Sequence, residues 1–324
     1  MTVRVGQAGL GEWGKNLARN FADLADLAWL SDPAEGKADE FQSRYPQARW
    51  AESFEEMLED PSLDAVVVAT PVPTHYELAK RALEAGKHVF VEKPPAMKSD
   101  EIDELVSIAE GRDLVLMPGH LLLYHPGVLK LKELVDAGEL GEVLMVYGNR
   151  QNLGVIRKHE NALWSLGVHD LSVILYLLDE DPVEAVALGQ SLLKTGVEDV
   201  VFCYLRFPSG KIAHMHLSWL DPHKMRKMTV VGTEKMAVFD DMELERKVTI
   251  YDKAPWKRAE TYGEWQTRSG DIYSPKLPND EPLRLECSHF LELVAGNGDR
   301  RKVAEDGARV VRALDMLTTS LNGS

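Results

Sequence analysis

Cysteine is scarce in this sequence, and long apolar runs are absent. The 324 residues include only two cysteines, Cys203 and Cys287, and neither stands at a metal-ligand spacing. The sequence therefore gives no support to a disulfide framework or a structural zinc site. No apolar stretch approaches the length of a membrane-spanning helix, and a strand predicted from Val3 leaves no room for a signal segment. We expect a reduced, cytoplasmic protein with no membrane partner and no bound metal.

Basic residues are also in short supply. The 37 lysines and arginines stand against 52 aspartates and glutamates, which gives a formal net charge of −15. This balance argues against duplex nucleic acid or an anionic membrane as a partner, although it leaves room for a local basic pocket that binds a phosphorylated small molecule. The length predicts two domains with a substantial core.

A glycine-rich segment lies near the start of the chain. Residues 3–8 are predicted to form a strand and residues 15–21 a helix, and between them stands Gly9-Leu10-Gly11-Glu12-Trp13-Gly14. In a dinucleotide-binding turn the first glycine permits the tight turn, the second lets the backbone approach a pyrophosphate, and the third lets helix and strand pack closely. The helix N-terminus then offers unpaired N–H groups to the phosphates. The segment predicts a dinucleotide site.

An acidic residue follows at the spacing that ribose recognition requires. Residues 27–31 are predicted to form a short apolar strand, and Asp32 stands at its end, about 20 residues beyond the glycines. A carboxylate there accepts hydrogen bonds from ribose hydroxyls and repels a 2′-phosphate, which favours NAD over NADP. The alternative is that Asp32 only initiates the turn at Pro33.

Strands and helices alternate through the first third of the chain. Strands are predicted at 64–69 and 114–117, and capping residues are predicted for the helices between strands, at Ser53, Thr74 and Ser99. This alternation is typical of a doubly wound parallel sheet in an α/β protein. We place the end of the first domain at residue 120.

Two strand ends of this domain carry polar residues. The 64–69 strand is followed by a loop that ends at His75, and this histidine either starts the next helix or contacts the cofactor. The buried run at 89–91 is followed by Glu92, Lys93 and two prolines, so Lys93 is held at a strand end. Ligands bind beyond such carboxyl ends in a parallel sheet. The alternative is a solvated surface lysine beside a turn.

The second part of the chain has a different pattern. Helices are predicted at 128–137, 162–178, 282–295 and 304–321, and residues 254–279 are predicted to form a long loop. A hairpin turn at 208–211 joins two of a series of strands that have no helices between them, and this series predicts a large, mainly antiparallel sheet: 183–189, 200–207, 212–220, 227–232, 235–240 and 247–251.

Polar residues in this part suggest contacts with a substrate. Residues 150–154 and 157–159 are predicted to form a basic loop, in which Arg150 and Asn152 contact an anionic substrate or remain solvated. His169 stands on the 162–178 helix one turn after Ser165, and it is either functional or a packed or capping residue. His214 and His216 project from one face of a predicted strand, but no further metal ligand joins them.

By these motifs the chain resembles the Gfo/Idh/MocA family of nicotinamide-dependent oxidoreductases. The resemblance spans nearly the whole chain and is carried by Gly9-Leu10-Gly11-Glu12-Trp13-Gly14-Lys15-Asn16, Ala69-Thr70-Pro71 with Thr74-His75, Ala85-Gly86-Lys87-His88-Val89-Phe90-Val91-Glu92-Lys93-Pro94, Gly167-Val168-His169-Asp170, and Glu281-Pro282-Leu283-Arg284 with Glu286-Cys287-Ser288-His289-Phe290.

The resemblance implies a fold and two catalytic residues. It implies a Rossmann NAD-binding domain at 1–120, and a substrate-binding and oligomerisation domain at 121–324 whose open sheet assembles a homodimer or homotetramer. It assigns catalysis to Lys93 and acid/base chemistry to His169. Many relatives have an aspartate four residues before this histidine, where the present sequence has Ser165.

The predicted contacts form two sets. For the cofactor we predict Gly9, Leu10, Gly11, Glu12, Trp13, Gly14, Asp32, Thr70, Pro71, Thr74, His75, Glu92 and Lys93. For the substrate we predict His120, Tyr124, Arg150, Asn152, Trp164, Ser165 and Asp170.

The predicted activity is hydride transfer between NAD and a secondary hydroxyl of a sugar. His169 is the expected base and Lys93 the donor that orients the oxygen, or Lys93 is itself the base if burial depresses its pKa. Within the family the chain resembles the branch that oxidises C3 of UDP-N-acetylated hexosamines or their uronates. Two alternatives are a free-sugar, polyol or inositol dehydrogenase or reductase, and a non-catalytic regulator that senses the cofactor.

Overall fold

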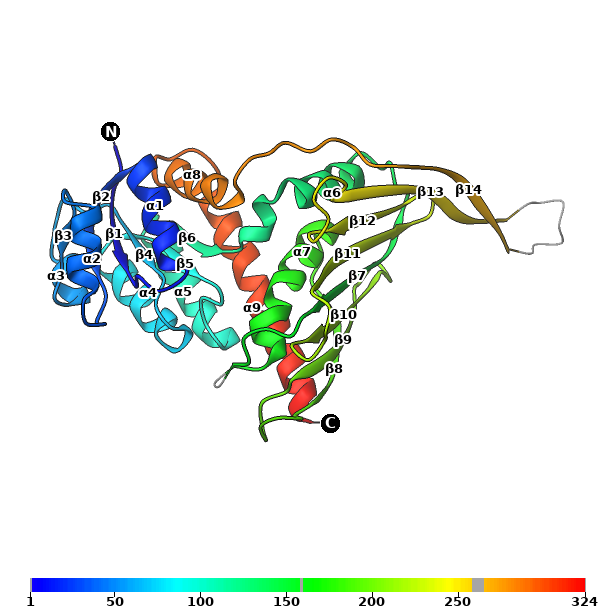
Figure 1. Cartoon of the computed structure of the whole chain (residues 1–324), viewed down its shortest axis with the longest axis horizontal. Coiled ribbons are helices and arrows are strands. Elements are labelled where there is room, and N and C mark those ends of the chain that lie inside the picture. Colours follow the sequence, from blue (N-terminus) through cyan, green and yellow to red (C-terminus); the bar gives the residue numbers. More distant parts are fainter. Residues whose placement is uncertain (1, 158–159, 258–264, 324) are drawn as a thin grey trace. The chain divides into compact units, whose positions relative to one another are not determined.

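The chain forms two compact units (Figure 1). The computed structural model describes residues 2–157, 160–257 and 265–323. Unit 1 comprises Met1–Leu121 with Asp280–Arg312, and unit 2 comprises Leu122–Asn279 with Ala313–Ser324. The first boundary lies within one residue of the predicted one. The segment Asp280–Arg312, which was predicted from the sequence to belong to the second domain, groups with unit 1.

Unit 1 is built on a six-stranded parallel sheet. Its strand order is β3-β2-β1-β4-β5-β6, with all five pairings parallel. The strands are β1 (Arg4–Ala8), β2 (Asp26–Ser31), β3 (Arg49–Trp50), β4 (Ala65–Val68), β5 (His88–Glu92) and β6 (Leu116–Gly119). The helices are α1 (Gly14–Leu24), α2 (Lys37–Arg44), α3 (Phe54–Leu58), α4 (His75–Glu84), α5 (Ser99–Gly111), α8 (Pro282–Val294) and the first part of α9 (Arg300–Asn322). The predicted doubly wound sheet is confirmed.

The order of the strands reverses direction between β1 and β4. From β1 the chain moves outward to β2 and β3, and from β4 it moves the other way to β5 and β6. Because crossover connections are right-handed, α1 and α4 lie on opposite faces of the sheet. On the α1 face the ring of Phe290 from α8 packs edge-on against Phe21 and Phe90, at centroid distances of 6.0 and 5.7 Å. Ligands bind at such a reversal, beyond the strand ends.

Unit 2 is built on an eight-stranded sheet. Its strand order is β14-β13-β12-β11-β7-β10-β9-β8, and every pairing is antiparallel except that of β7 with β10. The strands are β7 (Val143–Gln151), β8 (Glu184–Gln190), β9 (Val200–Arg206), β10 (Ile212–Ser218), β11 (Met225–Gly232), β12 (Met236–Asp240), β13 (Val248–Lys257) and β14 (Trp265–Tyr273). The predicted mainly antiparallel sheet is confirmed.

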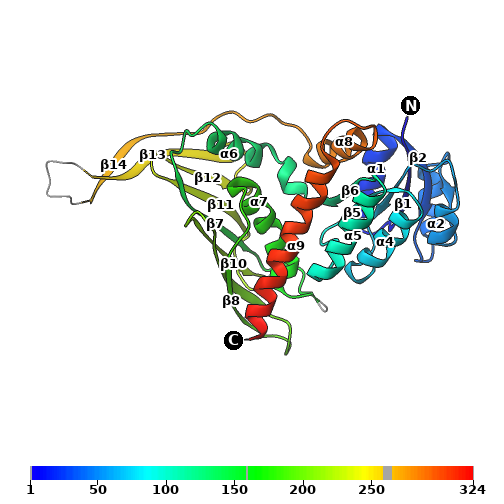
Figure 2. The ribbon, with the colours of Figure 1, turned by 180° about the vertical axis from the view of Figure 1, so that it is seen from behind.

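The sheet of unit 2 is covered by helices on one face. Helices α6 (Pro126–Asp136) and α7 (Val168–Leu178) lie against it, as the views from front and back in Figures 1 and 2 show. The inward side chains of β9 are Val201, Cys203 and Leu205, which are at most 4% exposed. On the other face Phe202 is 52% exposed and Leu188 is 58% exposed. This alternation is expected of an antiparallel sheet with one open face.

Two predictions of local structure in unit 2 are corrected. Residues 254–279 are not one long loop, because β13 continues to Lys257 and β14 runs from Trp265 to Tyr273 as its antiparallel partner. The predicted basic loop starts later than expected, since Arg150 and Gln151 are the last residues of β7. Lys158 and His159 of that loop lie outside the described residues.

The predicted helix caps are confirmed in one case of three. The Ser53 side chain accepts a hydrogen bond from the Glu56 N–H at 3.2 Å, as predicted. The Thr74 hydroxyl instead donates to the Pro71 carbonyl at 2.8 Å and makes no cap bond. Ser99 is the first residue of α5, and Lys98 is its N-cap. Among the described residues, every helix is too short or too polar to cross a bilayer.

Candidate active site

The glycine-rich loop has the geometry of a dinucleotide turn. Gly9 has a φ of +93°, and a Cβ there would lie 2.4 Å from the Ala69 carbonyl oxygen. A Cβ on Gly14 would lie 2.2 Å from the Gly9 carbonyl oxygen, so both positions exclude a side chain. A Cβ on Gly11 would meet nothing within 4 Å. The space at Gly11 is therefore open to a ligand, as a pyrophosphate at the start of α1 requires.

Asp32 joins this loop to the end of β2. Its Oδ2 accepts a hydrogen bond from the Leu10 N–H at 2.7 Å, and its Oδ1 accepts one from the Ala34 N–H at 2.9 Å. Each carboxylate oxygen keeps a lone pair, so the group can still accept from ribose hydroxyls. The hydrogen bond from the Ala34 N–H shows that Asp32 also initiates the turn at Pro33, which was the alternative prediction. Turn formation and ribose binding are compatible.

The loop after β4 is held by its own hydroxyl and imidazole groups. The Thr70 and Thr74 hydroxyl oxygens lie 2.7 Å apart. His75 is buried, and its ring nitrogens lie 2.8 Å from the Pro94 carbonyl oxygen and 2.7 Å from the Thr70 carbonyl oxygen. His75 also begins α4, as the first alternative expected. Its ring therefore links the loops after β4 and β5, and a contact of His75 with the cofactor stays a prediction.

Glu92 and Lys93 stand at the carboxyl end of β5. The Trp13 indole N–H donates to Glu92 Oε1 at 2.5 Å, and the Lys93 backbone N–H lies 3.3 Å from Oε2. Burial raises the pKa of Glu92 to about 7, against the opposing effects of the Lys93 charge and the Trp13 hydrogen bond. The Lys93–Pro94 peptide bond is cis. Trp13, Glu92 and Lys93 thus come together at one edge of the sheet.

His120 follows the neighbouring strand β6. It is 5% exposed, and its Nε2 has no hydrogen-bond partner among the described residues. Burial, and then the positive charge of Lys93, lower the pKa of His120 to about 4. The ring is therefore neutral at physiological pH. A neutral imidazole with an open nitrogen can either donate to or accept from a substrate hydroxyl, depending on its tautomer.

Unit 2 places the predicted residues around His169 on a helix with an irregular start. Residues Leu163–Gly167 form a π-helical turn, and α7 continues from Val168. Because a π-turn is wider than an α-turn, four residues do not complete it, and the predicted alignment of Ser165 with His169 on one face does not follow from α-helical spacing. Trp164 is buried and its indole donates to the Thr318 hydroxyl at 3.0 Å.

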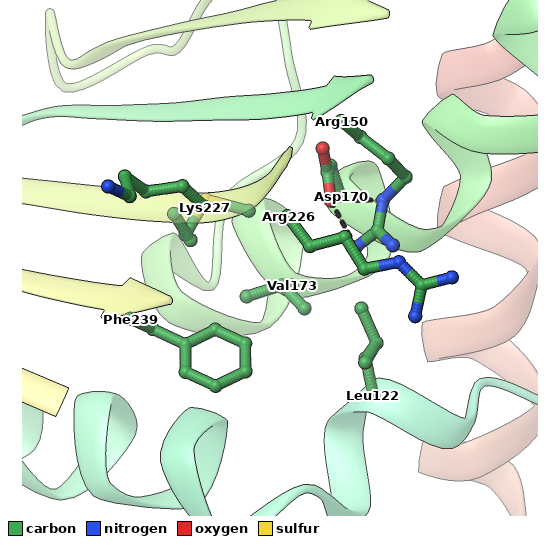
Figure 3. Close-up of a pocket in the computed structure, with 8 residues that line it drawn as sticks. Leu122, Arg150, Asp170, Val173, Arg226, Lys227 and Phe239 are labelled. Atoms are coloured by element: carbon green, nitrogen blue, oxygen red, sulfur yellow. Dashed lines mark hydrogen bonds and ion pairs between the residues drawn. The ribbon is translucent and has the colours of Figure 1, made fainter. Parts of the chain in front are cut away.

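Arg150 and Asp170 form a buried ion pair (Figure 3). Both Nε and Nη2 of Arg150 donate to Asp170 Oδ1, at 2.8 and 2.6 Å. The pair lines a small hollow that is also lined by Leu122, Val173, Arg226, Lys227, Met228 and Phe239. The pKa of Asp170 is raised by burial, with Arg150 opposing the rise. Much of the predicted anion-binding capacity of Arg150 is thus directed at Asp170.

Arg226 lies beside this pair and was missed from the sequence. Figure 3 shows its guanidinium next to that of Arg150, above Leu122. Its side chain is 41% exposed, and its guanidinium makes a long contact of 3.4 Å with Asp241. The sequence holds no signal for this role, because Arg226 lies on β11 outside every motif. Asn152 follows β7 and donates its N–H to the Ser218 carbonyl at 3.1 Å, and Tyr124 ends the turn that precedes α6.

Comparisons with known proteins agree with this architecture. Residues 3–120 match a model described as an oxidoreductase family with an NAD-binding Rossmann fold, GFO_IDH_MocA. Residues 128–238 match the C-terminal domain of the same family.

Several relatives with known activities are dehydrogenases. A scyllo-inositol 2-dehydrogenase (NAD(+)) of Bacillus subtilis is 28% identical over 307 residues, which cover 90% of this chain and 86% of the relative. A UDP-N-acetylglucosamine 3-dehydrogenase of Acidithiobacillus ferrooxidans is 27% identical over 241 residues, which cover 74% of each chain. A solved structure of the enzyme of that name from this organism has a TM-score of 0.84 at 25% identity, and the match covers 100% of this chain and 99% of that chain.

Proposed function

Since the chain belongs to the Gfo/Idh/MocA family and is an NAD-dependent oxidoreductase of CH–OH groups, we propose that it transfers hydride between NAD and a secondary hydroxyl of a sugar, at C3 of a UDP-sugar. The proposal rests on the position of Lys93. This lysine follows the end of β5, at the same edge of the sheet as the open glycine loop. Bound NAD supplies the acceptor of the hydride. The chain supplies the groups that bind it, orient the sugar and move the proton.

The cofactor is held by unit 1. The N–H groups at the start of α1 receive the pyrophosphate beside Gly11, and Asp32 accepts from the ribose hydroxyls. Thr70 and Pro71 line the same edge of the sheet after β4, and Trp13 and Glu92 flank the end of β5. A carboxylate at the ribose position favours NAD over NADP, because a 2′-phosphate would be repelled.

The proton chemistry falls to Lys93 and His169. Oxidation removes a proton from the substrate hydroxyl while the hydride leaves the same carbon. The ammonium group of Lys93 donates to the substrate oxygen and stabilises the developing alkoxide, and His169 accepts the hydroxyl proton. Ser165 lacks the charge of the aspartate that many relatives have, so a larger share of the proton transfer rests with Lys93 and His169.

A UDP-sugar is supported by the basic hollow in unit 2. A diphosphate needs guanidinium groups in an otherwise acidic protein, and Arg226 lines the hollow beside the Arg150–Asp170 pair. The relative and the solved structure that act on UDP-N-acetylglucosamine support the same choice. The inositol dehydrogenases among the relatives support the alternative of a free polyol as substrate, with the same cofactor.

A substrate panel separates these alternatives. We expect NADH absorbance to appear with a UDP-N-acetylhexosamine or its uronate, and not with free hexoses or inositols. Arg226→Ala should raise KM for the UDP-sugar about tenfold while KM for NAD stays unchanged, and Arg246→Ala, at an exposed position, is the control. Turnover of inositol alone would contradict the UDP-sugar proposal. Arg150→Ala is a poorer test, because it also leaves Asp170 buried without its partner.

Substitution of Lys93 tests the mechanism itself. Lys93→Ala should lower kcat by about 10²–10⁴-fold, since a charged donor and proton carrier is lost. Lys98→Ala, a nearby exposed lysine, should leave kcat unchanged. An unchanged rate in Lys93→Ala would overturn the mechanism. Binding of NAD without turnover of any sugar would favour the cofactor-sensing regulator instead.

A further inference from the structure

Glu286 is a buried carboxyl group that the proposed mechanism does not use. It lies on α8, it is 0% exposed, and neither of its carboxyl oxygens has a hydrogen-bond partner among the described residues. Charged side chains are almost never buried without a partner, because an isolated ion loses its hydration in the protein interior. The burial of Glu286 without a partner therefore needs a physical reason.

The packing of α8 directs Glu286 toward the end of β5. Phe290, one helical turn after Glu286, packs against Phe90 with ring centroids 5.7 Å apart. Glu92 stands two residues after Phe90 and therefore on the same face of the strand. Gly119 on β6 leaves room for the Glu92 side chain, because a Cβ at Gly119 would lie only 3.2 Å from Glu92 Oε1. Glu286 and Glu92 are consequently neighbours across the interface of α8 and β5.

The electrostatics agree with this placement and indicate that Glu286 holds a proton. Burial first, and then the negative charge of Glu92, raise the pKa of Glu286 well above its ordinary value. Both effects favour the neutral, protonated form of Glu286. A neutral carboxyl carries an O–H group, and a buried O–H group needs an acceptor because it has lost its hydrogen bonds to water.

The other titratable groups near Glu286 do not supply that acceptor. At the N-cap of α8, Glu281 accepts from Arg19 and Asn20 of α1. Burial raises the pKa of the Cys287 thiol, so this group is neutral. Lys93, on the β5 side, is a cation and cannot accept.

Glu92, whose charge acts on Glu286, offers an acceptor. Its Oε1 accepts from the Trp13 indole, and among the described residues its Oε2 makes one hydrogen-bond contact, a long one of 3.3 Å with the Lys93 backbone N–H. Oε2 therefore keeps lone pairs for a stronger donor.

We propose that Glu286 is a positioning residue: its protonated carboxyl group donates a hydrogen bond to Oε2 of Glu92, directly or through one buried water molecule, and so fixes the Glu92 carboxylate beside Lys93. The proposal rests on the role proposed for Lys93. Trp13 holds one oxygen of Glu92 and Glu286 holds the other. The negative charge that faces Lys93 then has one orientation when substrate and cofactor bind.

Infrared difference spectroscopy on the full chain tests the proton first, without any turnover. About two pH units above the pKa of Glu92, which is about 7, the wild type should still show a protonated-carboxyl band. Glu286→Gln should remove this band. The control Glu292→Gln, an isosteric change at an exposed position of the same helix, should leave it. Absence of the band from the wild type would overturn the proposal.

The same spectra then test the hydrogen bond. Glu286→Met removes the donor at nearly constant volume, so the pKa of Glu92 should rise by about one unit or more and kcat should fall about tenfold, with KM for NAD unchanged. In Glu286→Gln the amide N–H replaces the O–H, so the pKa of Glu92 and kcat should stay near the wild-type values. Glu92→Gln identifies the band of Glu92.

Two results would reject the positioning role. An unchanged pKa of Glu92 in Glu286→Met would show that Glu286 only fills space, and a lowered pKa of Glu92 in Glu286→Gln would show that Glu286 is charged. If Glu286→Met does not fold, the comparison of wild type with Glu286→Gln still decides. Failure of the mechanism would appear separately, as unchanged turnover in Lys93→Ala.

Discussion

Gly11 and Gly14 lie three residues apart in one loop, yet a methyl group would have different consequences at each. At Gly14 it would lie 2.2 Å from a backbone oxygen, whereas at Gly11 it would meet nothing within 4 Å. Gly14→Ala should therefore destabilise the fold by about 1–3 kcal/mol, because backbone has to move. Gly11→Ala should change stability by less than about 0.5 kcal/mol and still weaken NAD binding.

Thermal unfolding and NAD titration of both variants check this contrast. Gly36→Ala is unsuitable as a control because Gly36 has a φ of +80°, but Gly111, where a Cβ also meets nothing within 4 Å, is far from the loop in sequence and suits the purpose. Gly111→Ala should leave NAD binding unchanged. Equal NAD affinity in the wild type and Gly11→Ala would contradict the placement of the pyrophosphate at Gly11.

Glu92 makes the stability of the protein depend on pH. Its pKa in the folded state is about 7, above the ordinary value of 4.5, so the folded protein binds a proton that the unfolded chain has lost between these values. Stability from this group is therefore fully present below about pH 4.5 and falls as the pH rises through 7. Glu92→Gln should be more stable than the wild type at pH 8, by roughly 1–3 kcal/mol, and equally stable at pH 4. Urea unfolding at both pH values measures the difference, and the opposite trend would contradict burial of this charge.

At the scale of elements, the Arg150–Asp170 pair ties β7 to α7. Both side chains are less than 10% exposed, so removal of one leaves the other as a buried, uncompensated charge. Arg150→Met should destabilise the protein by about 3–5 kcal/mol, and the double variant Arg150→Met, Asp170→Leu should recover most of this loss. Denaturant unfolding of the four proteins forms a double-mutant cycle.

The exposed pair Arg206–Glu184 provides the matched control on the same sheet. Its two side chains are 47% and 46% exposed, so water solvates either partner when the other is removed. Arg206→Met should cost less than about 1 kcal/mol. A similar cost for Arg150→Met would mean that the Arg150–Asp170 pair is solvated in the protein.

Elements with strong periodicity were predictable, and those that depend on distant partners were not. The alternation of β9 and the apolar run of β4 predict their strands because one or both faces are buried. The strand β14 was missed because all of its described side chains are exposed, so its sequence lacks an apolar face, and only its pairing with β13 makes it a strand. Thr74 makes no side-chain cap bond because its backbone already has helical geometry, with φ of −103° and ψ of −8°, whereas a capping residue is typically extended.

The candidate site was predictable to the extent that it lies in continuous motifs. Lys93, Asp32 and the glycine loop follow from local sequence and strand order. Glu286 belonged to a motif, but its lack of a partner is visible only when α8 packs on β5. The role of Arg226 was not predictable from local sequence, because an arginine on a strand does not indicate whether its side chain lines a hollow.

At the scale of the whole molecule, the open face of the unit 2 sheet predicts self-association. Leu188 and Phe202 are paired on adjacent strands and are 58% and 52% exposed. Exposed apolar neighbours of this kind mark interaction surfaces. We expect a homodimer or homotetramer by light scattering after size-exclusion chromatography. Phe202→Lys should shift the protein toward the monomer, whereas Leu244→Lys, at a 90% exposed position, should not. A monomeric wild type would contradict the prediction.

The return of Asp280–Arg312 to unit 1 sets an order of events during synthesis. The glycine loop and Lys93 are translated early, but α8, which packs on Phe21 and Phe90, is translated only after the whole sheet of unit 2. Domains generally fold as units while the chain grows. On the ribosome, unit 1 therefore keeps an apolar face uncovered until α8 has been synthesised, although its sheet was translated first.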